Sequence, residues 1–171
     1  MNLEQKIMEK LNAIRRTETL KTDKDSGYVI EEEIDSMRLR AEIQDFDKFS
    51  YMVKTLTVTQ TPTPNAPVKA LLLQQANEIE RRISYLLESF RLVELDEING
   101  LAQVRSVSPF KKNDETVYYE ALLQHGNSVT FTRYRKQRHT EKREVIPSHL
   151  TQETFERLIN DLAAIVRINV S

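Results

Sequence analysis

The side chains between Met37 and Ile43 alternate strictly between apolar and charged residues. Successive side chains of a strand point to opposite faces of a sheet, so this pattern predicts a strand with one face in a core and the other in water. It favours an antiparallel sheet with one wet face over a parallel sheet that is covered on both faces. The apolar positions are Met37, Leu39, Ala41 and Ile43, and the charged residues between them are Arg38, Arg40 and Glu42.

The alternation continues into a second strand with a change of phase. Phe49, Tyr51 and Val53 are spaced by two, whereas Leu56 and Val58 stand one position out of step. An extra residue in one strand of an antiparallel pair shifts the phase in this way, which predicts a β-bulge near residues 54–55. A further strand is expected at Tyr28–Ile34.

The dipeptide Asn99-Gly100 predicts a β-hairpin with a two-residue turn. It would join strands at residues 91–98 and 101–108, with Glu94 opposite Arg105. Such a pair of opposite charges stabilises a hairpin, and it supports this register.

Gly126-Asn127 predicts a second hairpin, between residues 117–124 and 128–135. In that register Leu122 faces Phe131 and Glu120 faces Arg133. The alternative for residues 114–125 is a helix that ends at Gly126, because glycine commonly follows the last turn of a helix. A final strand is expected at residues 141–146.

Three segments have the apolar spacing of amphipathic helices, at residues 2–16, 66–89 and 151–167. The second is the longest, and the third has Thr151 as a plausible N-cap. The connector 61–67 contains three prolines, which prevent regular pairing. With 171 residues the chain is expected to form a single α+β domain, and this connector is the one candidate point of subdivision. We predict a mainly antiparallel sheet of six to eight strands, with a short N-terminal helix, a long central helix and a C-terminal helix packed on one face.

Composition excludes several classes of site. The chain has no cysteine, so it has no disulfide, thiolate zinc site or cysteine nucleophile, and its three glycines are too far apart for a phosphate-binding loop. The three histidines, His125, His139 and His149, share no helical or strand spacing, so we expect them in solvated turns and expect no metal site. No catalytic residue and no cofactor is indicated. An apolar stretch of about 20 residues, as a membrane span needs, is absent, and so is a signal-peptide core, so a cytoplasmic location is expected.

The charges are segregated along the chain. Residues 23–47 hold nine acidic and three basic side chains, whereas residues 101–143 hold nine basic and four acidic ones. The plainer interpretation is two solvated surfaces of opposite charge, and the sharper one is a homo-oligomer held by complementary faces. Leu71, Leu73 and Tyr85 lie off or at the edge of the central helix's apolar stripe, and they are the candidates for a partner interface.

Residues 133–143 are rich in basic side chains, and the aromatic residues Phe131 and Tyr134 lie before and within this stretch. A projecting basic hairpin can contact phosphates, and Tyr134 or Phe131 could stack on a base. The alternative, which we favour, is a charged hairpin that protects a sheet edge. The candidate nucleic-acid-binding residues are Arg133, Tyr134, Arg135, Lys136, Arg138, Lys142 and Arg143.

A metal-dependent polyphosphate-processing enzyme is a third hypothesis. Glu31-Glu32-Glu33, followed by Arg38 and Arg40, could hold a divalent cation and a polyphosphate, as in triphosphate-tunnel enzymes. Those enzymes have an ExExK pattern, and this chain has Asp35 where the lysine would stand. The basic residues of positions 133–143 could complete such a site only if the sheet closed on itself. The leading hypothesis is therefore a non-enzymatic, self-associating binding or accessory protein.

Overall fold

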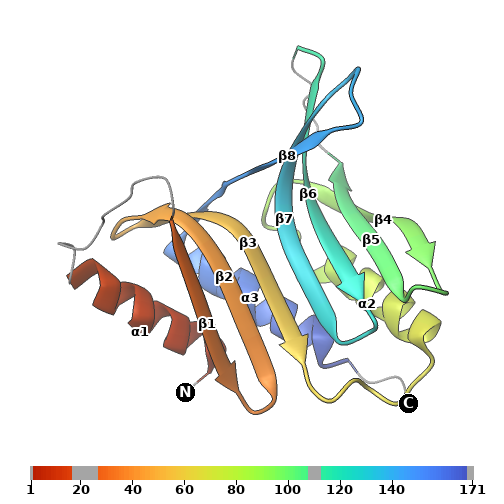
Figure 1. The fold of residues 1–171 in the computed structure, drawn as a ribbon, viewed down its shortest axis with the longest axis horizontal. Coiled ribbons are helices and arrows are strands. Elements are labelled where there is room, and N and C mark those ends of the chain that lie inside the picture. The colour runs from red at the N-terminus through yellow and green to blue at the C-terminus, as the bar shows by residue number, and fades with distance from the viewer. Residues whose placement is uncertain (1, 17–26, 108–112, 169–171) are drawn as a thin grey trace.

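The computed structural model describes residues 2–16, 27–107 and 113–168. The described residues form three helices and nine strands, in an α+β arrangement that confirms the predicted fold class (Figure 1). In chain order these are α1 Leu3–Arg16, β1 Tyr28–Ile34, β2 Met37–Phe46, β3 Ser50–Gln60, α2 Val68–Arg82, β4 Ser89–Asp96, β5 Leu101–Val107, β6 Glu115–Gln124, β7 Ser128–Gln137, β8 Arg143–Ile146, β9 Ser148–Thr151 and α3 Gln152–Val166.

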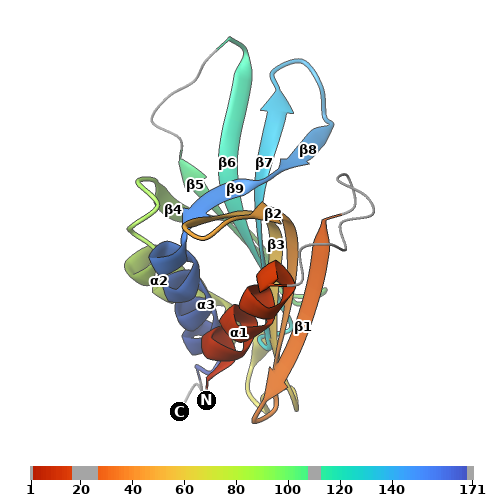
Figure 2. The same ribbon diagram turned by 90° about the vertical axis from the view of Figure 1, so that its left-hand side faces the viewer.

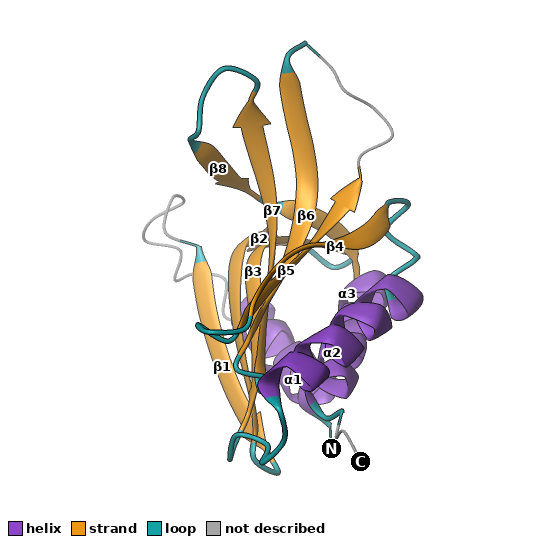
Figure 3. Ribbon diagram, turned by 90° about the vertical axis from the view of Figure 1, so that its right-hand side faces the viewer, coloured by secondary structure: helices purple, strands orange, loops and turns teal. Residues whose placement is uncertain are grey.

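All strand pairs of the sheet are antiparallel, in the order β1-β2-β3-β7-β6-β5-β4. Two four-residue strands lie off this path, β8 beside β7 and β9 beside β3. They take the count past the predicted six to eight, because β9 had no sequence signal of its own. The three helices cover one face of the sheet, and the opposite face is free of helices (Figures 2 and 3).

The core lies between the helices and the covered face of the sheet. α1 and α3 contribute the apolar stripes that their sequences predicted, α2 contributes part of its stripe, and the alternating residues of β2 are buried on the same side. The predicted bulge is confirmed at Lys54, since Ile43 pairs with Val53 and Glu42 pairs with Thr55. Phe49 lies outside the strand and is 73% exposed, which corrects its expected burial.

The central helix is shorter than its apolar stripe suggested, because it ends at Arg82 rather than at residue 89. Ile83 still donates its N–H to Ile79 O, but its backbone (φ −92°, ψ 72°) leaves the helix, and Leu87 has φ +63°. Ile83 and Phe90 are nevertheless buried. They are buried because the chain turns back into β4. The apolar residues therefore keep the spacing of a helix beyond the residue at which the helix ends.

The first predicted hairpin has a longer turn than expected. Asp96 pairs with Leu101, so residues 97–100 form a four-residue turn, and Glu94 faces Gln103 rather than the predicted Arg105. The Asp96 carboxylate stabilises this turn by accepting hydrogen bonds from Asn99 N (3.1 Å) and Asn99 Nδ2 (2.7 Å).

The second hairpin is confirmed as strands, which excludes the helical alternative for residues 114–125, but its register differs by one residue. Gln124 pairs with Ser128 across a three-residue turn in which His125 and Gly126 both have positive φ. Glu120 therefore faces Thr132 instead of Arg133. A slip of one residue exchanges the two faces of a strand, and the observed register places Ala121 and Phe131 together in the core.

Candidate functional site

A groove of about 600 Å³ opens where the sheet extends beyond the helices. One wall is the α2–β4 connection (residues 85–88), and the other is β9 with the first turn of α3 (residues 149–151 and Thr154). The floor comes from the ends of β6 and β7. β9 crosses this region and leads directly into α3 (Figure 2).

Strand alternation places a cation in this groove. Val129 and Phe131 point from β7 into the core, so Arg133, two residues further on, lies on the same face at the place where helix cover ends. Tyr119 stands opposite it on β6. Arg133 Nη1 donates to the Tyr119 hydroxyl at 3.0 Å, and its guanidinium carbon lies 4.7 Å from the centroid of the Tyr119 ring.

The guanidinium of Arg133 is incompletely partnered. Its Nε atom is buried and has no hydrogen-bond acceptor, and within the described residues Arg133 belongs to no ion pair. Arg135 on the same strand reaches Glu144 at 3.3 Å, and Arg143 reaches Glu120 at 2.7 Å. A buried donor without an acceptor is costly, and a buried charge without a partner is costlier still.

Two acidic groups line the same groove. Burial raises the pKa of the Glu88 carboxyl, while the charge of Arg133 and a hydrogen bond from Ser106 oppose that rise. Burial also raises the pKa of the Tyr119 phenol, and the Arg133 charge opposes that change as well. Tyr119 therefore keeps its proton at neutral pH, and its hydroxyl can donate into the groove.

The apolar part of the lining is formed by Leu86, Leu87, Val117 and Leu150. Leu87 is 88% exposed, which leaves apolar surface directly beside Glu88. His149, expected in a solvated position, is exposed and lines this groove. The arrangement combines one cation, a phenol donor and an apolar wall, which suits the binding of an amphipathic anion.

The candidate nucleic-acid-binding residues are divided between the two faces of the sheet. Arg133 and Arg135 share the face of the groove, and Tyr134 and Lys136 point to the helix-free face. The Arg143 guanidinium lies 3.7 Å from the Tyr134 ring centroid, and Phe131 is buried in the core. Neither ring is therefore presented in the way that base stacking was expected to use it. Arg138 reaches Asp114 at 3.4 Å, and Lys142 is exposed.

The three candidate interface residues have different environments. Leu71 is fully buried against the β6–β7 turn of the same chain, so this turn is the surface that covers it. Leu73 is 38% exposed. Tyr85 lines the groove, where its hydroxyl donates to Asp161 Oδ2 at 2.8 Å and the Arg157 guanidinium lies 4.2 Å from its ring centroid.

The charges considered for a polyphosphate site pair within the β1–β2 hairpin and with Lys10 of α1. Arg40 Nε reaches Glu31 at 3.2 Å, Arg38 reaches Glu33 at 3.4 Å, and Lys10 from α1 reaches Glu32 at 2.9 Å. In the described sheet β1 and β4 are the two outer strands. The closure that would bring the arginines of β7 and β8 to these glutamates is therefore not present.

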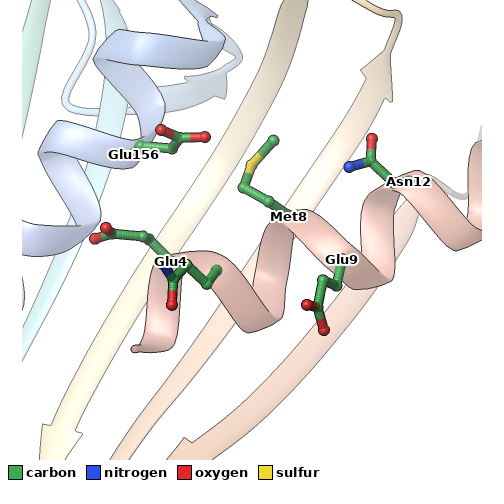
Figure 4. A pocket seen from close by; sticks show the side chains of 6 residues that line it. Glu4, Met8, Glu9, Asn12 and Glu156 are labelled. Atoms are coloured by element: carbon green, nitrogen blue, oxygen red, sulfur yellow. The ribbon is translucent and has the colours of Figure 1, made fainter. Parts of the chain in front are cut away.

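A second hollow, of about 630 Å³, lies between α1 and α3. Glu4 and Met8 of α1 line it on one side and Glu156 of α3 on the other (Figure 4). Across the described part of the chain, no group of three or more histidine or carboxylate side chains is arranged to hold a metal ion. None of the helices in that part is both long enough and apolar enough to traverse a bilayer.

Comparison with known protein families, with curated proteins and with solved structures finds no match to this chain.

The sequence alone did not predict the groove. The alternation of side chains along β7 would have placed Arg133 on the same face as the buried Val129 and Phe131. The predicted hairpin register instead paired Arg133 with Glu120. Glu88 had no signal, because it fell inside the predicted central helix.

Proposed function

We propose that this chain is a binding protein without catalytic machinery, and that it holds an amphipathic organic anion in the groove around Arg133. The observation that carries the proposal is the buried Arg133 Nε, which donates to no acceptor. An anionic oxygen at this position would satisfy the donor and compensate the charge in one step. The planar guanidinium fork is suited to carboxylate and phosphate oxygens.

The apolar side chains at positions 86, 87, 117 and 150 argue that the anion has an apolar body. An inorganic ion would leave Leu87 exposed, whereas an alkyl or aryl group laid on it would remove apolar area from water. Each buried methylene contributes about 0.8 kcal/mol, so a short chain adds substantially to the affinity.

Calorimetric titration with decanoate below its micelle concentration and with decanol below its solubility limit tests this function. We expect decanoate to bind and decanol, which has the same chain without the charge, to bind at least about tenfold more weakly. Arg133→Gln should lose decanoate binding, and Arg91→Gln, an equal loss of charge at an exposed residue outside the groove, should retain it. Equal binding of the two ligands, or full binding by Arg133→Gln, would overturn the proposal.

A measurement on the unmodified protein guards against misfolding of the variant. The ¹⁵N and proton shifts of Arg133 Nε–H should move on addition of decanoate, because this group would gain an acceptor. Unchanged Arg133 shifts at saturating decanoate would place the ligand elsewhere. Self-association, nucleic-acid binding and a cytoplasmic location remain predictions from the sequence.

A further inference from the structure

Arg133 shares its groove with a carboxylate. Glu88 enters from the α2–β4 connection and lines the same groove as Arg133, yet the two side chains form no ion pair in the described structure. Ser106 on β5 donates a hydrogen bond to Glu88 and accepts one from Tyr119 N at 2.7 Å. Glu88 thus has a hydrogen-bond partner on the sheet side of the groove.

This arrangement limits how much negative charge a ligand can bring. Among the described residues that line the groove, Arg133 carries the only permanent positive charge, and Glu88 supplies one negative charge. A ligand with a single negative charge is compensated by the guanidinium. A second negative charge would meet the Glu88 carboxylate in a half-buried site, where repulsion is weakly screened.

The donors also match a planar anion. Arg133 Nε is free, and the Tyr119 hydroxyl, which accepts from Arg133 Nη1, still has its own proton to donate. A carboxylate has two oxygens, one for each of these donors. A phosphate monoester has three terminal oxygens, and the third would have to lie toward Glu88 or water.

We propose that Glu88 is a specificity-determining residue that makes the groove select a singly charged carboxylate over a doubly charged phosphate monoester. The inference rests on the proposed function, because it concerns the same groove and the same cation. It identifies the ligand class as a monocarboxylic acid with an apolar body, and it disfavours nucleotides and other polyphosphates.

Competition between decanoate and decyl phosphate at pH 8, where the phosphate is mostly a dianion, tests this selectivity. The wild-type protein should bind decanoate at least about tenfold more tightly, which corresponds to about 1.4 kcal/mol. Glu88→Gln should reduce that ratio to below about threefold, chiefly by tightening decyl phosphate binding. Glu94→Gln, the same loss of charge at an exposed β4 position outside the groove, should leave the ratio unchanged.

The outcomes separate the two proposals. If wild type binds both ligands equally and Arg133→Gln loses both, the anion-binding function stands and selectivity by Glu88 is wrong. An unchanged ratio in Glu88→Gln likewise overturns the role of Glu88 alone. If neither ligand binds the wild-type protein, the anion-binding function is wrong, and the selectivity is overturned with it.

Discussion

Arg143 reaches Glu120 through two hydrogen bonds, from Nη1 to Oε2 at 2.7 Å and from Nη2 to Oε1 at 3.2 Å. The pair spans β7 and ties the short strand β8 to β6 on the helix-free face. Arg105 from β5 donates to the same carboxylate at 2.9 Å. Burial disfavours the charge of Arg143, but its hydrogen bonds to Glu120 and Tyr118 outweigh burial and hold its pKa above the usual value.

Glu120→Ala is expected to destabilise the protein by about 2–4 kcal/mol, because it removes the anion from a buried pair and leaves two arginines without it. The Glu120 side chain is only 3% exposed, so water cannot replace the lost contacts easily. Glu144→Ala is the control, since this β8 side chain is 69% exposed and should cost less than about 0.5 kcal/mol. Urea unfolding of both variants measures the loss of stability in each. Equal losses would contradict a stabilising role for the contacts of Glu120 with Arg105 and Arg143.

The fold class was predictable because the spacing of apolar residues along the sequence follows the face of each helix or strand that is buried. The alternation at residues 37–43 and the stripes of α1 and α3 each identified an element and its buried face. The bulge at Lys54 was predictable for the same reason, since a change of phase has few other causes.

The hairpin registers were not predictable from the turn dipeptides alone. Side-chain and backbone details decided them: the Asp96 carboxylate bonds to Asn99, and His125 adopts a positive φ beside Gly126. Each change moves a pairing by a residue or more. The groove depends on these registers and on the early end of α2, so Arg133, Tyr119 and Glu88 could not be brought together from the sequence.

Gly126→Ala is expected to be more destabilising than Gly100→Ala by at least about 1 kcal/mol. Both glycines have positive φ, so alanine carries the same backbone strain at either site. A Cβ on Gly126 would lie 2.8 Å from Leu71 Cδ1, which is buried, whereas a Cβ on Gly100 would meet the ring of exposed His125, which can move. Denaturation midpoints and slopes measure the difference, and equal losses would show that Leu71 adjusts freely.

Thr151→Ala should lower the free energy of unfolding by about 1 kcal/mol, the usual contribution of an N-cap. The Thr151 hydroxyl accepts a hydrogen bond from Thr154 N at 3.2 Å at the start of α3. Thr151→Ser keeps the hydroxyl and should retain most of the stability. Thermal unfolding of the two variants is the measurement, and if serine loses as much as alanine, the methyl group rather than the cap is responsible.

Glu78→Gln should destabilise the protein at pH 7 and have no effect near pH 2. Hydrogen bonds from Arg81 and then Arg82 lower the pKa of Glu78 from 4.5 to about 2. A carboxyl whose pKa is lower in the folded state adds stability above its unfolded value, and this stability is lost as the pH falls through about 2. We expect a loss of about 1 kcal/mol at pH 7, since both pairs are partly exposed and lie within one helix.

The check is a series of urea titrations of wild type and Glu78→Gln between pH 7 and pH 2. Glu97→Gln, at an exposed turn position, is the control and should stay within about 0.5 kcal/mol of wild type throughout. The two curves for wild type and Glu78→Gln should converge only below pH 4.5, because the wild-type carboxyl keeps its arginine partners until it is protonated in the folded state. Convergence at a higher pH, or a constant difference down to pH 2, would mean that the arginines do not bind the ionised form of Glu78 in preference to its neutral form.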